Sequence, residues 1–163
     1  MQYSFSNNNQ EKKSHLRIWE ETEMTLTFGY NTPINSEILA PYLEVILSDP
    51  LEINTIELTA LIDTGYDGEI LIPKDIYYKL NLKAFEYSSD LLNFAETASG
   101  EHLELQSANG SIKIKGADLL TIITVDSHEK CKEVIIGRKF LESYHILLKG
   151  PEKELAIELA LIQ

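Results

Sequence analysis

The chain has 163 residues, of which 44% are hydrophobic and 25% charged, and its formal net charge is −12. This composition is ordinary for a globular chain of one domain, so it excludes wholesale disorder. A surface with such an excess of acids repels a phosphate backbone, and we therefore expect no nucleic-acid partner.

The first half of the chain alternates extended segments with loops. A polar tail covers residues 1–15. One or two strands are predicted within residues 16–28, and three more at residues 42–47, 55–62 and 69–72. Pro73 favours a helix start, and residues 74–81 suit a helix of about two turns. Residues 83–93 are ambiguous.

The second half is richer in strand patterns. Six strands are predicted, at residues 102–106, 111–116, 118–125, 133–136, 145–149 and 154–162. Asn109–Gly110 and Lys115–Gly116 are expected to punctuate them as turns. Residues 138–144 suit a short helix. Residues 154–162 alternate cleanly, which favours a strand, although their Glu, Leu and Ala content also suits a helix.

These many short strands at close spacing, with two short helices among them, predict a mainly β barrel or sandwich with one or two short helices. We expect an N-terminal extension over residues 1–40, partly disordered or forming added strands, and one domain over residues 41–163. The N-terminal end is polar and resembles no secretory signal, and no apolar run approaches the ~20 residues of a membrane helix. The expectation is a cytoplasmic protein without membrane contact.

Two segments stand out as carriers of chemistry. The first is Leu61-Ile62-Asp63-Thr64-Gly65, and the second is Val134-Ile135-Ile136-Gly137-Arg138. A carboxylate that ends an apolar strand, as Asp63 does, is costly to bury unless it is paired or used. A glycine next to it lets the backbone approach closely.

This pair of segments resembles the retropepsin-like aspartic proteases, the single-domain relatives of pepsin. In that family one apolar strand delivers Asp-Thr-Gly, and a later one delivers Gly-Arg before a short helix. The resemblance spans residues 42–161. It implies a closed or partly open β-barrel of the acid protease type and an aspartic endopeptidase that acts on a peptide or protein substrate. Asp63 is then the catalytic residue, and Thr64, Gly65, Gly137 and Arg138 support the active-site loop.

The mechanism needs two carboxylates, because one takes a proton from water while the other polarises the peptide carbonyl. Only one Asp-Thr-Gly is present. The resemblance therefore implies a homodimer that supplies Asp63 twice at a two-fold axis, with Thr64 bonding across to the partner chain. Residues 155–161 are a candidate dimer strand, and they equally suit an ordinary core or edge strand.

The resemblance also predicts contacts around this loop. Arg138 is expected to form an ion pair with Asp67, with a structural role, although a plain surface arginine remains the alternative. Tyr66 and Lys139 depart from the family pattern, and a ring at position 66 could narrow the cleft.

A glycine-tipped hairpin, the flap, closes over the peptide in this family. Ala98, Ser99 and Gly100 are the candidate tip, and Asn109–Gly110 is the rival. The alternative for either is a tight turn without a gating role.

Other chemistry has little support in the sequence. The single cysteine excludes an intrachain disulfide framework. His128 and Cys131 are two possible ligands, which do not make a metal site. We predict neither metal nor cofactor. Two other functions stay open: a catalytically silent module of the same fold that binds peptides or a partner, and a plain β-domain in which Asp-Thr-Gly is only a turn.

Overall fold

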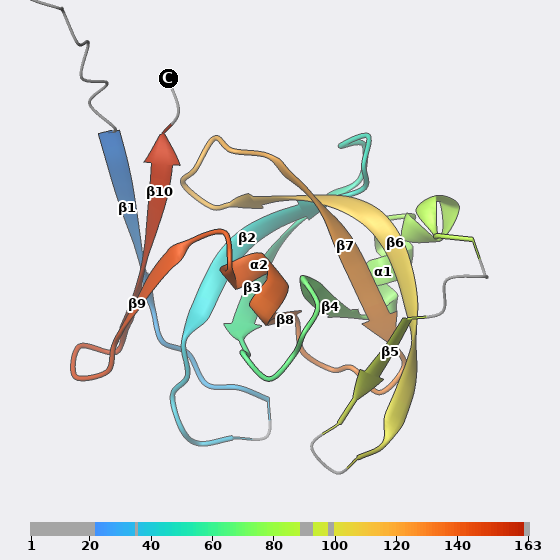
Figure 1. Cartoon of the computed structure of the whole chain (residues 1–163), viewed down its shortest axis with the longest axis horizontal. Helices are drawn as coiled ribbons and strands as arrows, with labels where there is room; N and C mark the ends of the chain where they lie inside the picture. The colour runs from blue at the N-terminus through green and yellow to red at the C-terminus, as the bar shows by residue number, and fades with distance from the viewer. Residues whose placement is uncertain (1–21, 35, 89–92, 98–99, 162–163) are drawn as a thin grey trace, which may run out of the picture.

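A computed structural model describes residues 22–34, 36–88, 93–97 and 100–161 of the chain. These residues form a mainly β protein with two short α-helices, as the sequence predicted. Their strands make one sheet of three strands and one of seven (Figure 1). None of the helices in this part of the chain is long and apolar enough to span a bilayer.

The seven-stranded sheet has the order β2-β3-β8-β4-β7-β6-β5. Its strands are β2 (Tyr42–Ser48), β3 (Thr55–Ile62), β4 (Ile70–Pro73), β5 (Asn93–Glu96), β6 (His102–Ile114), β7 (Thr121–His128) and β8 (Ile135–Ile136). The β3–β8 and β4–β7 pairs are parallel, and the other neighbours are antiparallel. Two motif-bearing segments far apart in the chain, β3 and β8, therefore lie side by side.

The closed form of the expected barrel is not adopted by the strands that the structure describes. Strand β2 also pairs with β6 over Val45–Ser48, so the sheet curls back on itself over part of its length. However, β5 pairs only with β6, and the strands of the smaller sheet pair only with one another. Strand β5 and the three strands of the smaller sheet therefore lie outside this curl.

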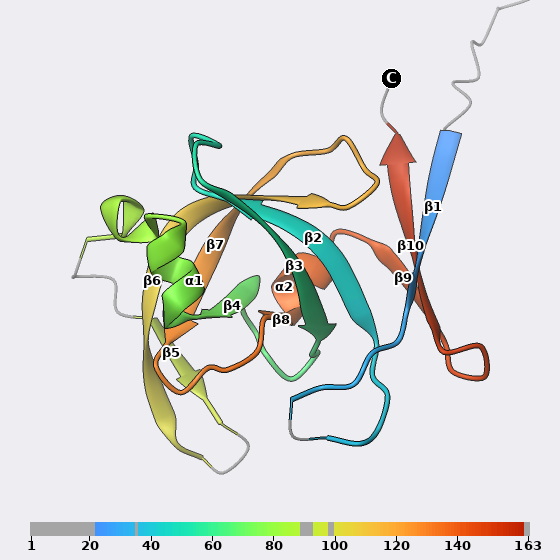
Figure 2. The ribbon, with the colours of Figure 1, turned by 180° about the vertical axis from the view of Figure 1, so that it is seen from behind.

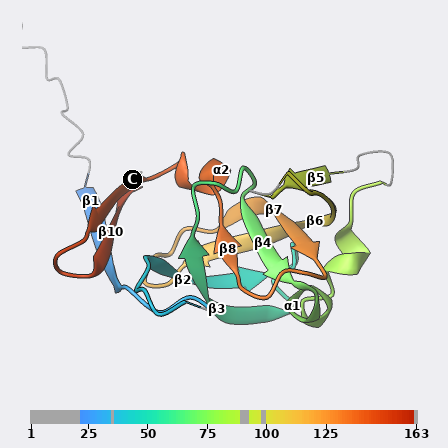
Figure 3. The same ribbon diagram turned by 90° about the horizontal axis from the view of Figure 1, so that it is seen from below.

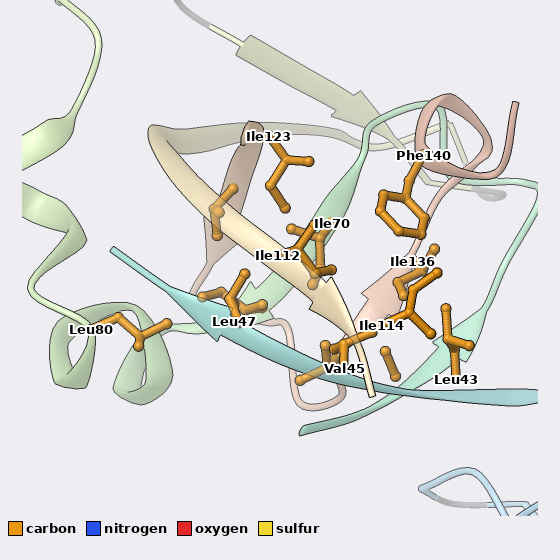
Figure 4. Close-up of a cluster of buried hydrophobic side chains, with 14 of the residues drawn as sticks. Leu43, Val45, Leu47, Ile70, Leu80, Ile112, Ile114, Ile123, Ile136 and Phe140 are labelled. Carbon is orange, nitrogen blue, oxygen red and sulfur yellow. The ribbon is translucent and has the colours of Figure 1, made fainter. Parts of the chain in front are cut away.

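The core lies inside the curl of the larger sheet (Figure 4). Strand β2 shows how its alternation fills this core: Leu43, Val45 and Leu47 are fully buried, whereas Glu44 is exposed and pairs with Lys115 at 3.1 Å. Burying apolar side chains of this size stabilises the fold by about 1.5–3 kcal/mol each.

The helices cover the ends of the sheet. Helix α1 (Lys74–Lys79) begins directly after Pro73 and buries Tyr77. A 3₁₀ turn, η1 (Leu82–Phe85), follows in the region that the sequence left ambiguous. Helix α2 (Arg138–Leu141) is shorter than predicted and packs the ring of Phe140 into the core, where Figure 4 shows it next to Ile136. Figures 2 and 3 place α1 at the end of the molecule away from the smaller sheet.

Strand β6 corrects the prediction of a turn at Asn109–Gly110. The two residues lie within a continuous strand and pair with Thr124 and Ile123 of β7. A Cβ at Gly110 would lie 2.5 Å from Val125 Cγ2, so the glycine makes room for a neighbouring side chain instead of turning the chain. The rival flap tip is therefore wrong.

The smaller sheet holds β1 (Thr22–Gly29), β10 (Glu154–Leu161) and β9 (His145–Lys149), in that order. Strand β10 is confirmed as a strand, and both of its edges are paired within the chain. Leu155 and Ile157 are fully buried and Leu159 is nearly so. Strand β10 therefore has the properties of a core strand. Strand β9 pairs only with Glu154–Glu158, so residues 159–161 are not paired with β9, and a role of β10 in a dimer stays a prediction. The boundary at residue 40 remains a prediction.

Candidate active site

The loop after β3 presents Asp63 at the end of a strand. The backbone N–H of Asp63 donates to the carbonyl of Ile136 in β8 at 3.0 Å, which fixes where the strand ends. The N–H of Gly65 donates to Asp63 Oδ1 at 2.8 Å, and the N–H of Tyr66 to the Asp63 carbonyl at 3.2 Å. The carboxylate is thus oriented by its own turn and is only partly buried, while Thr64 and Gly65 are exposed.

The second motif crosses directly beneath this loop. The N–H of Arg138 donates to the carbonyl of Tyr66 at 2.8 Å, and the N–H of Gly137 to that of Glu69 at 3.0 Å. A Cβ at Gly137 would lie 2.3 Å from the Gly68 carbonyl oxygen. The contact therefore requires a residue without a side chain at position 137, and it joins the two segments that the sequence singled out.

The ion pair predicted between Asp67 and Arg138 is present, with Arg138 Nη2 at 2.5 Å from Asp67 Oδ1. Both side chains are more than half exposed. Exposed pairs contribute little to stability, about 0–1 kcal/mol. Because the Asp67–Arg138 pair joins the loop after β3 to the first residue of α2, it helps to position the loop against this helix.

Tyr66 forms a buried contact that sequence reasoning missed. Its hydroxyl donates to Asp126 Oδ2 in β7 at 2.5 Å, and the Asp126 side chain is almost fully buried. The hydroxyl of Ser107 and the amide of Asn93 also donate to Asp126 Oδ1. Burial, and then the charge of Asp126, raise the pKa of Tyr66, so its hydroxyl remains a donor. The network ties the loop to β5, β6 and β7.

The hairpin predicted to carry the flap is formed by β5 and β6. At its turn the N–H of Thr97 donates to the Glu101 carbonyl at 2.9 Å, and Gly100 has a φ of 82°, a backbone conformation that favours glycine. Ala98 and Ser99 lie outside the described residues. Glu101 forms an ion pair with Lys130, which follows β7.

A cavity of about 780 Å³ lies between the loop and this hairpin. Its walls are residues 63 and 65–69, all of β5 with Thr97, parts of β4, β6, β7 and β8, and Lys139 of α2. Figure 3 shows the loop after β3, α2 and β5 along one side of the molecule. Asp63 therefore lies at the wall of a space large enough to receive several side chains of a ligand.

Most of the other acids around the cavity already have partners. Asp126 accepts the hydrogen bonds described above, and Asp67 pairs with Arg138. Glu69 accepts the Thr124 N–H at 2.6 Å and lies 3.7 Å from Lys139 Nζ. The fifth acid, Glu96, is exposed on the hairpin.

The fold and the site together define a β-rich protein in which a carboxylate, oriented by the N–H of a nearby glycine, lies at the wall of a cavity. No model of a known protein family matches the chain. An uncharacterized protein of Archaeoglobus fulgidus is 31% identical in an alignment of 114 positions that covers 66% of this chain and 85% of that protein. The chain belongs to the same family as this archaeal protein. Among solved structures, EIAV protease complexed with the inhibitor HBY-793 overlaps 68% of this chain and 92% of its own, with 23% identity and a TM-score of 0.43.

Proposed function

We propose that the protein is an aspartic endopeptidase that acts as a homodimer, with a water molecule activated by two Asp63 carboxylates from two chains. The observation that carries the proposal is the carboxylate of Asp63, oriented by the Gly65 N–H at the wall of a cavity covered by the β5–β6 hairpin. An oriented carboxylate at a space for a peptide is half of the carboxylate pair that this chemistry needs.

Two carboxylates about 3 Å apart cannot both ionise, so they share one proton. The ionised member removes a proton from water, and the protonated member donates to the carbonyl oxygen of the scissile bond. The proton taken from water then passes to the leaving nitrogen, and the proton given to the carbonyl oxygen returns to the carboxylate pair as the C–N bond breaks, so that one water is consumed and one amide bond is broken. This division of roles predicts activity at acidic to neutral pH.

The state of three of the other four acids at the cavity supports the need for a second chain; the fourth, Glu96, is exposed on the hairpin. Hydrogen-bond donors or cations already bind the carboxylates of Asp126, Asp67 and Glu69. Sharing a proton with Asp63 would require any of these groups to break such contacts. The exposed turn of Thr64 and Gly65 leaves the approach to Asp63 open to a symmetric partner. Because this turn is exposed next to Asp63, we place the interface there.

The test is cleavage of a mixed peptide library between pH 3.5 and 7.5 by the wild type and by Asp63→Asn. The amide oxygen of Asn can still accept the Gly65 N–H, so the variant should fold. Asp118→Asn makes the same chemical change at an exposed position and serves as the matched control. We expect cleavage by the wild type and the control and none by Asp63→Asn. A folded wild type that cleaves nothing would contradict the proposal and favour a peptide-binding module.

A further inference from the structure

A second cavity, of about 410 Å³, adjoins the one at Asp63. The two share Leu71, Thr97, Leu103 and Ile135 in their walls. The two cavities are therefore contiguous along these four residues, beside the hairpin turn and the segment after β7. A ligand extended beyond the first cavity would meet the second.

The far wall of the second cavity comes from the N-terminal segment. Ile34 lines it, and its backbone N–H donates to Glu133 Oε1 at 3.4 Å. The segment is closed by a bridge in which Asn31 and Ala40 exchange backbone hydrogen bonds of 3.0 and 2.8 Å. The hydroxyl of Tyr42 also donates to Glu133. Ile34 is thus held in place, yet its side chain is 51% exposed.

The chemistry of the walls indicates what the cavity receives. Apolar surface is supplied by Ile34, Leu71, Leu103 and Ile135. Covering the exposed side chain of Ile34 with an apolar group removes apolar surface from water, which is favourable. Among the acidic and basic residues of the walls, Lys130 is paired with Glu101 and Glu133 accepts the donors named above, and His128 and Lys132 complete the set. Most of the wall surface is nevertheless apolar, so the cavity suits an apolar side chain better than a charged one.

We propose that this second cavity is a subsite for an apolar side chain of the same peptide that spans Asp63, and that Ile34 sets its preference. The occupant follows from the continuity of the two cavities, and the inference rests on the proposed function. A segment that lies before the first strand of the larger sheet thereby becomes part of the substrate groove.

The first arm of the test is the cleavage profile of Ile34→Ser. Lost contact with an apolar group lowers discrimination by about tenfold or more, so the preference for apolar residues should fall by that factor at one substrate position and persist at the others. Ile53→Ser is the matched control, because Ile53 is 73% exposed in the β2–β3 turn and lines neither cavity. A profile of Ile34→Ser that equals the wild-type profile would overturn the proposal.

The second arm does not depend on cleavage. Cys131 is the only cysteine of the chain and lines the second cavity. Its modification by N-ethylmaleimide is followed in Asp63→Asn, with and without apolar hexapeptides, and with polar hexapeptides of equal length. We expect the apolar peptides alone to slow the reaction several-fold. Equal rates would overturn the subsite, whereas protection without wild-type cleavage would remove only the proposed peptidase.

Discussion

An alanine at position 137 would bring a methyl group into the crossing of the two motifs. Its Cβ would lie 2.3 Å from the Gly68 carbonyl oxygen, 2.6 Å from the Tyr66 carbonyl oxygen and 2.6 Å from Tyr66 Cδ1. Two of these atoms belong to the backbone and cannot rotate away, so the cost lies near the upper end for overpacking, about 3 kcal/mol. Alanine also lowers the conformational entropy of the unfolded chain, which stabilises the folded state by about 0.5 kcal/mol.

The net loss of about 2.5 kcal/mol corresponds to a fall in Tm of about 5–10 °C for a chain of this size. Thermal unfolding followed by circular dichroism measures it. Gly150→Ala is the matched control, because no heavy atom lies within 4 Å of its added Cβ and its φ lies outside the left-handed region. The control should stay within about 2 °C of the wild type. A Gly137→Ala protein as stable as the control would refute the close contact between the loop and position 137.

Two further predictions concern buried carboxylates. Tyr66→Phe should lower the free energy of unfolding by about 2 kcal/mol, because the buried Asp126 loses one of its hydrogen-bond donors. The control Tyr78→Phe, at a half-exposed ring, should change it by less than about 0.5 kcal/mol. Equal effects of the two substitutions in urea unfolding would contradict this. Burial would raise the pKa of Asp49, but the donors of Asn54 and of the turn outweigh it and hold the pKa below its ordinary value. That stabilisation is present above about pH 4 and is lost as the pH falls through the lower folded value, so stability should fall more steeply below about pH 4 in the wild type than in Asp49→Asn. Parallel pH curves for the two proteins would show that Asp49 contributes nothing.

The strands that carry the two motifs could be predicted because each depends on a local pattern. An apolar run that ends in Asp63 predicts both a buried strand and a polar loop, and the run before Gly137 does the same. The Asp67–Arg138 pair was predicted from a resemblance and not from spacing, since no local pattern joins residues so far apart in the chain.

The remaining features depend on contacts that no short stretch of sequence encodes. Asn109–Gly110 carries the strongest short signal for a turn, yet pairing with β7 and the space taken by Val125 keep the chain extended. The hydroxyl of Tyr66 donates to Asp126, sixty positions further along the chain. The sequence around an aspartate in an apolar strand does not indicate which distant residues donate hydrogen bonds to it. Likewise, nothing in the alternation of β10 tells whether its edges are paired within the chain.

The central claim, one active site built from two chains, is tested most directly by mixing. Wild type and Asp63→Asn are unfolded and refolded together at constant total concentration, so that chains pair at random, and a tag on the variant verifies mixed dimers. If each site needs Asp63 from both chains, equal amounts should leave about a quarter of the wild-type activity. Activity of about half would contradict the account, because each chain would then carry a complete site of its own.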